Sequence, residues 1–275
     1  MATATGQKAA PALYNQIAAV YDRTRQLPPW LPERLADTAL NLIGGEQPPR
    51  ILEVGVGTGR VACGFLRSGL VSRYVGLDVS TRMLAELVRK YGSAVTPVLG
   101  DASMLPFDDA TFDAVLSCHV LQMLPDLTAV LAEIRRVLRP GGLYLHCTDE
   151  LAPHQQELDQ VWQRRLAEED PGYRPAERYD MRRDDVVQLW NATDGLVDTA
   201  EVATWQTSHA VGDLLTAYES KAYPSCLRVP EAAFLRAVAR LREHCLAIYP
   251  GLDHQLSSTS RMEIVATRMP TAGQG

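Results

Sequence analysis

A strand that runs into a glycine-rich turn, residues 50–60 with the sequence RILEVGVGTGR, constrains the fold more than any other segment. Residues 51–54 have the composition of a buried strand, and Gly55, Gly57 and Gly59 follow at alternate positions. Glycine serves where the backbone must adopt positive φ or lie close to a ligand. A strand, a glycine turn and a helix in succession are how an open parallel sheet holds a nucleotide-like ligand.

The spacing of the glycines indicates which kind of ligand this turn would bind. The dinucleotide fingerprint is G-x-G-x-x-G, with the pyrophosphate at a helix N-terminus. Here the pattern is G-x-G-x-G, Arg60 follows it, and Glu53 precedes the first glycine by two positions. Because this acid would repel a pyrophosphate, the motif favours a ligand that carries an ammonium group. We expect the Arg60 head group to lie in solvent or to pair with an acid.

Acids and glycines recur at the ends of later apolar runs. The segments are VGLDVS at 75–80, GDA at 100–102 followed by LPF at 105–107 and FDAV at 112–115, and VLRPGG at 137–142. Together with the glycine turn, they resemble the motifs of class I S-adenosylmethionine-dependent methyltransferases. They match that family in order and at suitable distances over residues 45–150.

The resemblance implies an α/β fold, a Rossmann-like methyltransferase sandwich. Its seven-stranded sheet is mostly parallel with an antiparallel last strand, and N-terminal helices and a helical cap are added to it. The alternation of strand and helix patterns independently predicts a parallel sheet, and the unbroken apolar runs predict that helices cover both faces. We predict strands at 50–54, 73–78, 95–99, 112–117, 142–148, 196–205 and 258–268, and helices at 11–25, 32–43, 59–67, 81–91, 126–138, 153–169, 182–194, 210–223 and 230–248.

The pattern changes after the fifth predicted strand, which favours one catalytic domain with an added helical cap. The predicted organisation is 1–45, N-terminal helices closing over the cofactor site; 46–150, the S-adenosylmethionine-binding core; 151–195, a helical insertion or cap; and 196–275, C-terminal strands with inserted cap helices.

Composition excludes several classes of protein. The net charge of −6 argues against a nucleic-acid surface, and no apolar run approaches the ~20 residues that span a bilayer. The N-terminus lacks the apolar core of a secretion signal. Five scattered cysteines without a C-x-x-C pair indicate reduced thiols and no zinc or other metal site. We therefore expect a cytoplasmic protein, a monomer or homodimer, with a small-molecule substrate and neither nucleic acid nor membrane as partner.

The resemblance also implies which residues bind S-adenosyl-L-methionine, with S-adenosyl-L-homocysteine as product. Glu53 would act on the amino group through a water, and Asp78 would accept both ribose hydroxyls. Asp101 with Ala102 would receive the adenine amine, and Met83 would pack on the adenine unless it is simply core. The rest of the implied cofactor set is Tyr14, Tyr21, Gly55, Gly57, Gly59, Val79 and Cys118.

The acceptor side is less constrained. His119, at the end of the fourth predicted strand, is the candidate general base, and a purely structural histidine is the equal alternative. His146, inside the fifth strand, is interpreted as buried packing. The candidate substrate contacts are His119, Gln122, Tyr218 and Tyr223, and lid-to-body packing is the other interpretation of the aromatic residues.

The sequence therefore predicts transfer of a methyl group from S-adenosylmethionine to a small molecule. The substrate would lie at the carboxyl edge of the sheet under the helical cap. Two alternatives stay open: non-methyl chemistry at the same cofactor site, such as a cyclisation, and a catalytically silent cofactor binder that engages a protein. RNA methylation and a dehydrogenase are disfavoured, the first by the acidic balance and the second by the glycine spacing.

Overall fold

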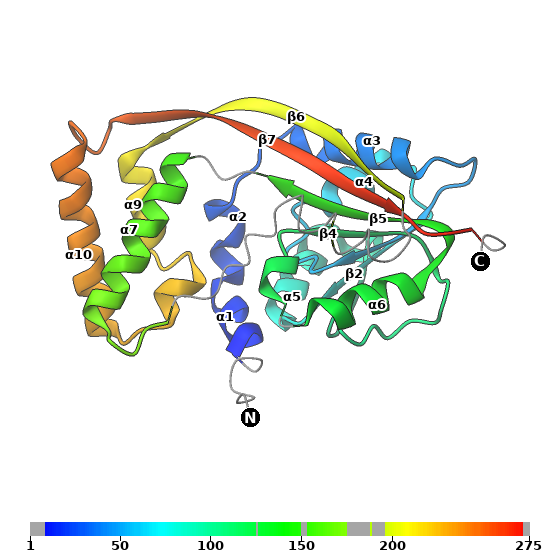
Figure 1. Ribbon diagram of the computed structural model, residues 1–275, viewed down its shortest axis with the longest axis horizontal. Helices are drawn as coiled ribbons and strands as arrows, with labels where there is room; N and C mark the ends of the chain where they lie inside the picture. The colour runs from blue at the N-terminus through cyan, green and yellow to red at the C-terminus, as the bar shows by residue number, and fades with distance from the viewer. Residues whose placement is uncertain (1–8, 125, 150–152, 175–187, 189–195, 272–275) are drawn as a thin grey trace. The chain divides into compact units, whose positions relative to one another are not determined.

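The computed structural model describes residues 9–124, 126–149, 153–174, 188 and 196–271 (Figure 1). The chain divides into two compact units, each with its own core. The core unit comprises 1–148, 179–203 and 262–275, and the helical unit comprises 149–178 and 204–261.

A seven-stranded sheet organises the core unit, in the order β3-β2-β1-β4-β5-β7-β6. The strands are β1 (Arg50–Val54), β2 (Arg73–Asp78), β3 (Thr96–Leu99), β4 (Phe112–Cys118), β5 (Leu138–Asp149), β6 (Leu196–Ala210) and β7 (Gln255–Arg268). The strands from β3 to β5 pair in parallel. The Met269 N–H donates to the Gly142 carbonyl and the Gly141 N–H to the Pro270 carbonyl, the exchange of an antiparallel pair. The predicted fold class, with its antiparallel last strand, is confirmed.

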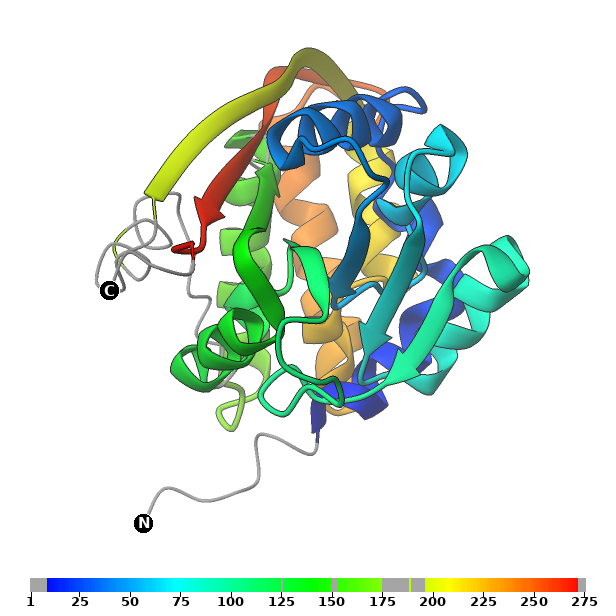
Figure 2. The same ribbon diagram turned by 90° about the vertical axis from the view of Figure 1, so that its right-hand side faces the viewer.

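Helices cover both faces of this sheet. They are α1 (Ala9–Ile17), α2 (Tyr21–Thr24), α3 (Leu31–Ile43), α4 (Ala62–Ser68), α5 (Thr81–Tyr91) and α6 (Leu127–Val137). The ring of Phe65 on α4 lies 5.5 Å from that of Tyr74 on β2. The neighbouring Val75 points to the opposite face and shares a buried cluster with Ile134 of α6. The inner strands β1, β2 and β4 are therefore buried on both sides, as their unbroken apolar runs predict, whereas the edge strand β3 is partly exposed (Figure 2).

The helical unit is built from α7 (Pro153–Glu169), α9 (Val211–Glu219) and α10 (Glu231–Ile248). Its core surrounds Trp162, whose ring lies 5.2 Å from Tyr218 and 6.0 Å from Phe234. The indole N–H of Trp162 donates to the Ser225 hydroxyl at 3.1 Å, so this buried polar atom is satisfied.

Several predicted boundaries were wrong, each for a local reason. The helix predicted over 11–25 is interrupted by a 3-10 turn, Ala18–Val20, and is therefore two helices. The fifth strand begins at Leu138 instead of residue 142, because the chain pairs with β4 through an irregularity that contains Gly141 at φ 73°. β6 and β7 are longer than predicted, and each contributes residues to both units. The helix predicted at 182–194 lies outside the described residues, apart from Gln188.

Two expectations about the whole chain can be compared with these coordinates. No helix in the described part of the chain is both long and apolar enough to cross a lipid bilayer. All five cysteines are free, and four of them are buried.

The close packing of α3 on α4 generates a stability prediction. A Cβ on Gly64 would lie 1.9 Å from the backbone carbonyl oxygen of Pro32. Because the backbone of α3 would have to shift to make room for the new methyl group, Gly64→Ala should lower the free energy of unfolding by about 3 kcal/mol in urea titrations. Arg67→Ala on the same helix, whose side chain is 64% exposed, is the control and should stay within about 0.5 kcal/mol. Equal stability of Gly64→Ala and wild type would contradict this packing.

Candidate functional site

The three glycines of the turn have positive φ, at 71° for Gly55, 56° for Gly57 and 79° for Gly59, but they face different surroundings. A Cβ on Gly55 would strike Val120, and one on Gly59 would strike Leu87. A Cβ on Gly57 would meet no protein atom within 4 Å. Gly55 and Gly59 are therefore required by packing, and Gly57 borders open space where a ligand can approach the backbone.

Asp78, at the end of β2, is tied to the glycine turn. Its Oδ2 accepts the Gly57 N–H at 2.8 Å, and its Oδ1 accepts the Ser80 N–H at 2.8 Å. Burial raises the pKa of this carboxyl, while the backbone N–H groups lower it. A carboxylate has about four acceptor positions, so Asp78 keeps capacity for two further donors.

Glu53, at the end of β1, is only 2% exposed. Its Oε2 accepts the Tyr74 hydroxyl at 2.7 Å. Burial raises the pKa of Glu53 to about 8, with the Tyr74 hydrogen bond opposing the shift and Asp78 adding to it. A buried carboxyl of this kind ionises readily only when a cation arrives beside it.

The remaining predicted cofactor residues on this edge differ in exposure. Asp101 is exposed, and its Oδ1 accepts the Ser103 N–H at 2.9 Å and the Ser103 hydroxyl at 2.8 Å. The preceding Gly100 donates its N–H to the Asp78 carbonyl at 3.1 Å, which links the ends of β2 and β3. Val79 is 38% exposed, whereas Ala102 and Met83 are buried, with exposed fractions of 4% and 2%.

The structure thus brings the three predicted acids to one edge of the sheet. β1 pairs with β2, β2 pairs with β3, and Asp78 both contacts the glycine turn and acts electrostatically on Glu53. This is the arrangement that the sequence predicts for an open parallel sheet.

The N-terminal helices contact the same edge through residues that sequence reasoning missed. Asp22 accepts a hydrogen bond from the Thr58 hydroxyl in the glycine turn and forms an ion pair with Lys90. Lys90 also donates to the Thr58 carbonyl at 2.8 Å. Asn15 Oδ1 accepts the Ser80 hydroxyl at 2.8 Å. These contacts join segments far apart in the sequence; Asn15 and Asp22 adjoin the predicted Tyr14 and Tyr21, but their partners could not be identified from the sequence.

The two predicted N-terminal tyrosines have defined partners. The Tyr14 hydroxyl donates to the Met123 sulfur. The guanidinium of Arg25 lies 4.4 Å from the Tyr21 ring centre, and that of Arg60 lies 5.9 Å from it. Arg60 is partly exposed and donates to the carbonyl oxygen of Arg25, a backbone contact that the sequence did not predict.

His119 follows β4 in the left-handed region, with φ 54°. Positive φ is uncommon for a residue with a side chain, and such strain concentrates at functional sites. His119 and Cys118 are both partly exposed. Gln122 lies in the 3-10 helix Leu121–Met123 that follows.

His146 is buried, as interpreted from the sequence, but it belongs to a polar network. Its Nδ1 lies 3.1 Å from the Ser117 hydroxyl, which lies 2.6 Å from the Tyr144 hydroxyl. Burial lowers the pKa of His146 to about 4, and the nearby His119 acts in the same direction. The imidazole is therefore neutral at physiological pH.

The two candidate substrate tyrosines lie in the helical unit. Tyr218 is 4% exposed within the Trp162 cluster, and its ring centre lies 4.8 Å from that of Tyr223, which is partly buried. These contacts give both residues a packing role, and substrate contact stays a prediction.

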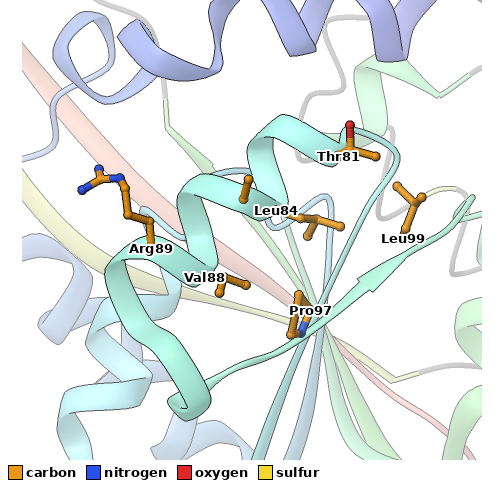
Figure 3. Close-up of a pocket in the computed structure, with 7 residues that line it drawn as sticks. Thr81, Leu84, Val88, Arg89, Pro97 and Leu99 are labelled. Atoms are coloured by element: carbon orange, nitrogen blue, oxygen red, sulfur yellow. The ribbon is translucent and has the colours of Figure 1, made fainter.

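A hollow between α5 and β3 is apolar and holds none of the predicted site residues (Figure 3). Leu84, Val88, Pro97 and Leu99 form most of its surface, with Thr81 at one end. Leu99 is 57% exposed, so this is a shallow feature of the sheet edge. We place the candidate site instead at the glycine turn, where the acids and open space coincide.

Comparisons with known proteins agree with this geometry. Residues 52–146 match the family described as "Methyltransferase domain". Malonyl-acyl-carrier-protein O-methyltransferase of Xylella fastidiosa is 34% identical over 134 residues, 48% of this chain and 45% of that protein. The chain spans about half the length of the curated relatives it matches.

Solved structures share the fold. An N-methyltransferase from Haemonchus contortus, in complex with phosphomonomethylethanolamine and S-adenosylhomocysteine, aligns with a TM-score of 0.54 at 17% identity, over 94% of this chain and 58% of that one. A (4+2)-cyclase aligns with a TM-score of 0.55 at 19% identity, over 87% of this chain and 81% of that one. Residues 52–146, which hold the glycine turn and the parallel strands β2 to β4, thus match a methyltransferase domain, and the solved structures share the fold of the chain.

Proposed function

We propose that this protein transfers a methyl group from S-adenosyl-L-methionine to a small organic acceptor and releases S-adenosyl-L-homocysteine. The observation that carries the proposal is the alignment of Glu53, Asp78 and Asp101 along one sheet edge beside the open space at Gly57. Three acceptors in a row complement a cationic nucleoside whose amine, ribose diol and adenine amine are all donors.

Each acid has a distinct role in this proposal. Asp78, held by two backbone N–H groups, has its remaining acceptor positions for the ribose hydroxyls. Glu53, buried with Tyr74, compensates the ammonium of the amino-acid end, directly or through a water. Asp101, exposed at the end of β3, is available to the adenine amine. Tyr14 and Tyr21 on the N-terminal helices cover the site.

The chemistry needs positioning above all. The sulfonium donor supplies an activated methyl group, so the protein must hold the acceptor atom about 3–3.5 Å from it and in line. A general base adds roughly 10²–10⁴-fold for a hydroxyl or protonated amine. His119 is our candidate for that base, because it is partly exposed and strained at the end of β4.

The acceptor is a small molecule in this proposal, and its reacting atom is not set by the fold. Relatives are named as O-methyltransferases and C-methyltransferases, and an N-methyltransferase shares the fold. Incubation with an isotopically labelled methyl donor and metabolite extracts, followed by mass spectrometry, tests the function. Failure to bind S-adenosylmethionine or S-adenosylhomocysteine in calorimetry would refute it.

The cyclase with the same fold keeps non-methyl chemistry as a second candidate. The two functions differ in one product: methyl transfer consumes the donor and yields S-adenosylhomocysteine in equal amount, whereas cyclisation leaves the cofactor intact. Quantifying S-adenosylhomocysteine after turnover therefore distinguishes them.

Gly57→Ala should weaken cofactor binding at least ~10-fold in calorimetry, because the new methyl group occupies the space through which the ligand reaches the backbone. Gly69→Ala is a matched control. Gly69 has φ +67° against +56° for Gly57, and neither Cβ would meet an atom within 4 Å. Both variants bear a similar backbone strain of about 1–2 kcal/mol, but only Gly57→Ala should lose affinity. Equal affinities would show that the ligand does not pass Gly57.

Glu53 should couple cofactor binding to proton release. Because its pKa is about 8 in the folded protein against 4.5 ordinarily, its burial costs stability as the pH rises from 4.5 through 8. An ammonium ligand favours the ionised form, so binding at pH 7 should release close to one proton. Calorimetry in buffers of different ionisation enthalpy measures this release. Glu53→Gln should abolish it and flatten the decline of Tm with pH; persistent release would assign the proton to another group.

His119→Ala should lower the maximal rate by at least ~10²-fold with little change in cofactor affinity, if His119 is the base. His119→Asn separates backbone from chemistry, since asparagine tolerates positive φ but accepts no proton at neutral pH. Both variants should be equally slow. Full activity of His119→Asn would reduce His119 to a structural role.

A further inference from the structure

Apolar residues lie on two opposite sides of α10, although a helix at the surface of a domain normally has one apolar side. The first side packs in the core of the helical unit, and its members are Phe234, Ala237, Leu241 and Cys245. α7 and α9 lie against this side (Figure 1). The opposite side also carries large apolar side chains, but these are exposed, so the fold of the helical unit does not use them.

The exposed side forms a continuous stripe along the helix. Its members are separated alternately by three and four positions, namely Ala232, Leu235, Ala239, Arg242 and Leu246. This spacing keeps residues on one line of a helix and is typical of helices that pair with each other. Leu235 is 57% exposed and Leu246 is 53% exposed. We call these five residues the α10 seam.

The α10 seam fits a second copy of itself in antiparallel orientation. When a two-fold axis at Ala239 relates two such helices, this small side chain faces its own copy and lets the helix axes approach to about 8 Å. Leu235 then lies between the partner's Arg242 and the partner's Leu246. Leu246 lies beside the partner's Ala232. Each leucine therefore meets apolar surface, either a short side chain, another leucine or the aliphatic stem of an arginine.

Charges beside the α10 seam favour this orientation. The two-fold axis places Arg236 about 1.5 Å along the helix from the level of the partner's Glu243. Glu243 forms no ion pair within the described part of the chain. Arg236 uses Nε and Nη2 for Glu169, which leaves Nη1 for a second carboxylate. A parallel pair would instead oppose Arg242 to its own copy, and facing like charges are destabilising.

We propose that this protein forms a homodimer through the α10 seam, with two antiparallel α10 helices related by a two-fold axis at Ala239. The contact buries Leu235 and Leu246 of each copy. It adds an ion pair between Arg236 and the partner's Glu243 on each side of the axis. The surface belongs to the helical unit, so the proposal goes beyond methyl transfer and does not depend on it.

Sedimentation equilibrium tests the dimer. Wild type should be a reversible dimer at about 100 μM. Leu235→Glu places one carboxylate from each copy in the seam and should raise the dimer Kd at least ~100-fold. Leu70→Glu is the matched control, since Leu70 is also 57% exposed but follows α4 in the core unit. Its Kd should equal that of wild type. A monomeric wild type, or equal weakening by both variants, would overturn the proposal.

Glu243→Arg tests the ion pairs without touching an apolar side chain, so it serves even if Leu235→Glu fails to fold. It replaces two attractions by two repulsions and should raise Kd about 10-fold at low salt. Glu46→Arg makes the same charge change at an exposed residue of the core unit. Added salt should strengthen the Glu243→Arg dimer relative to the Glu46→Arg dimer, because salt screens repulsion in one and attraction in the other. Identical salt dependence would refute the pairing.

Cysteine cross-linking separates the two orientations. Ala239→Cys should give a disulfide-linked dimer under mild oxidation, because this residue faces its own copy at the axis. Ala232→Cys should not, since an antiparallel pair holds its two copies about 21 Å apart along the helix. Wild type, in which four of the five cysteines are buried, is the control. Cross-linking of both variants would indicate a parallel pair, and cross-linking of neither would exclude contact at the seam; either result overturns the proposal.

Discussion

The hydrogen bond from the Gly57 N–H to the Asp78 carboxylate is the interaction on which the site depends. It joins the turn after β1 to the end of β2, and Asp78 in turn receives the Ser80 N–H at the start of α5. One carboxylate thereby organises two loops at the carboxyl edge of the sheet. Because parallel strands all end at this edge, any ligand bound there contacts several loops at once. Asp78 is partly buried, so these bonds are only partly exposed to water.

The N-terminal helices depend on the same turn. Thr58 lies between two of the glycines and is 1% exposed, yet it provides both a hydroxyl for Asp22 and a carbonyl for Lys90. Asn15 meets the Ser80 side chain that also caps α5. The glycine turn and the N-terminal helices therefore share hydrogen-bonding groups, so a substitution in the turn would also alter the contacts of these helices.

Sequence and structure agree where the signal is local. The strand at residues 50–54 and the helices at 81–91 and 153–169 begin and end as predicted, because apolar periodicity and the Ser80 cap define them. The predicted and observed structures differ where tertiary pairing outweighs the local preference of the sequence. β5 starts four residues early since it pairs with β4 through an irregularity, and Arg60 donates to the carbonyl of Arg25, which directly follows α2.

By itself, the sequence determined the fold class, the glycine turn and the three acids at strand ends, because these follow from short-range patterns that one family of folds shares. Only the tertiary structure decided that Glu53 is paired with Tyr74, that Gly57 alone of the three glycines faces open space, and that Ser117 contacts both Tyr144 and His146. Each of these depends on which side chains from distant segments share a strand face. Burial and hydrogen-bond distance, which set a carboxyl's pKa or a histidine's charge, exist only once those segments are packed together.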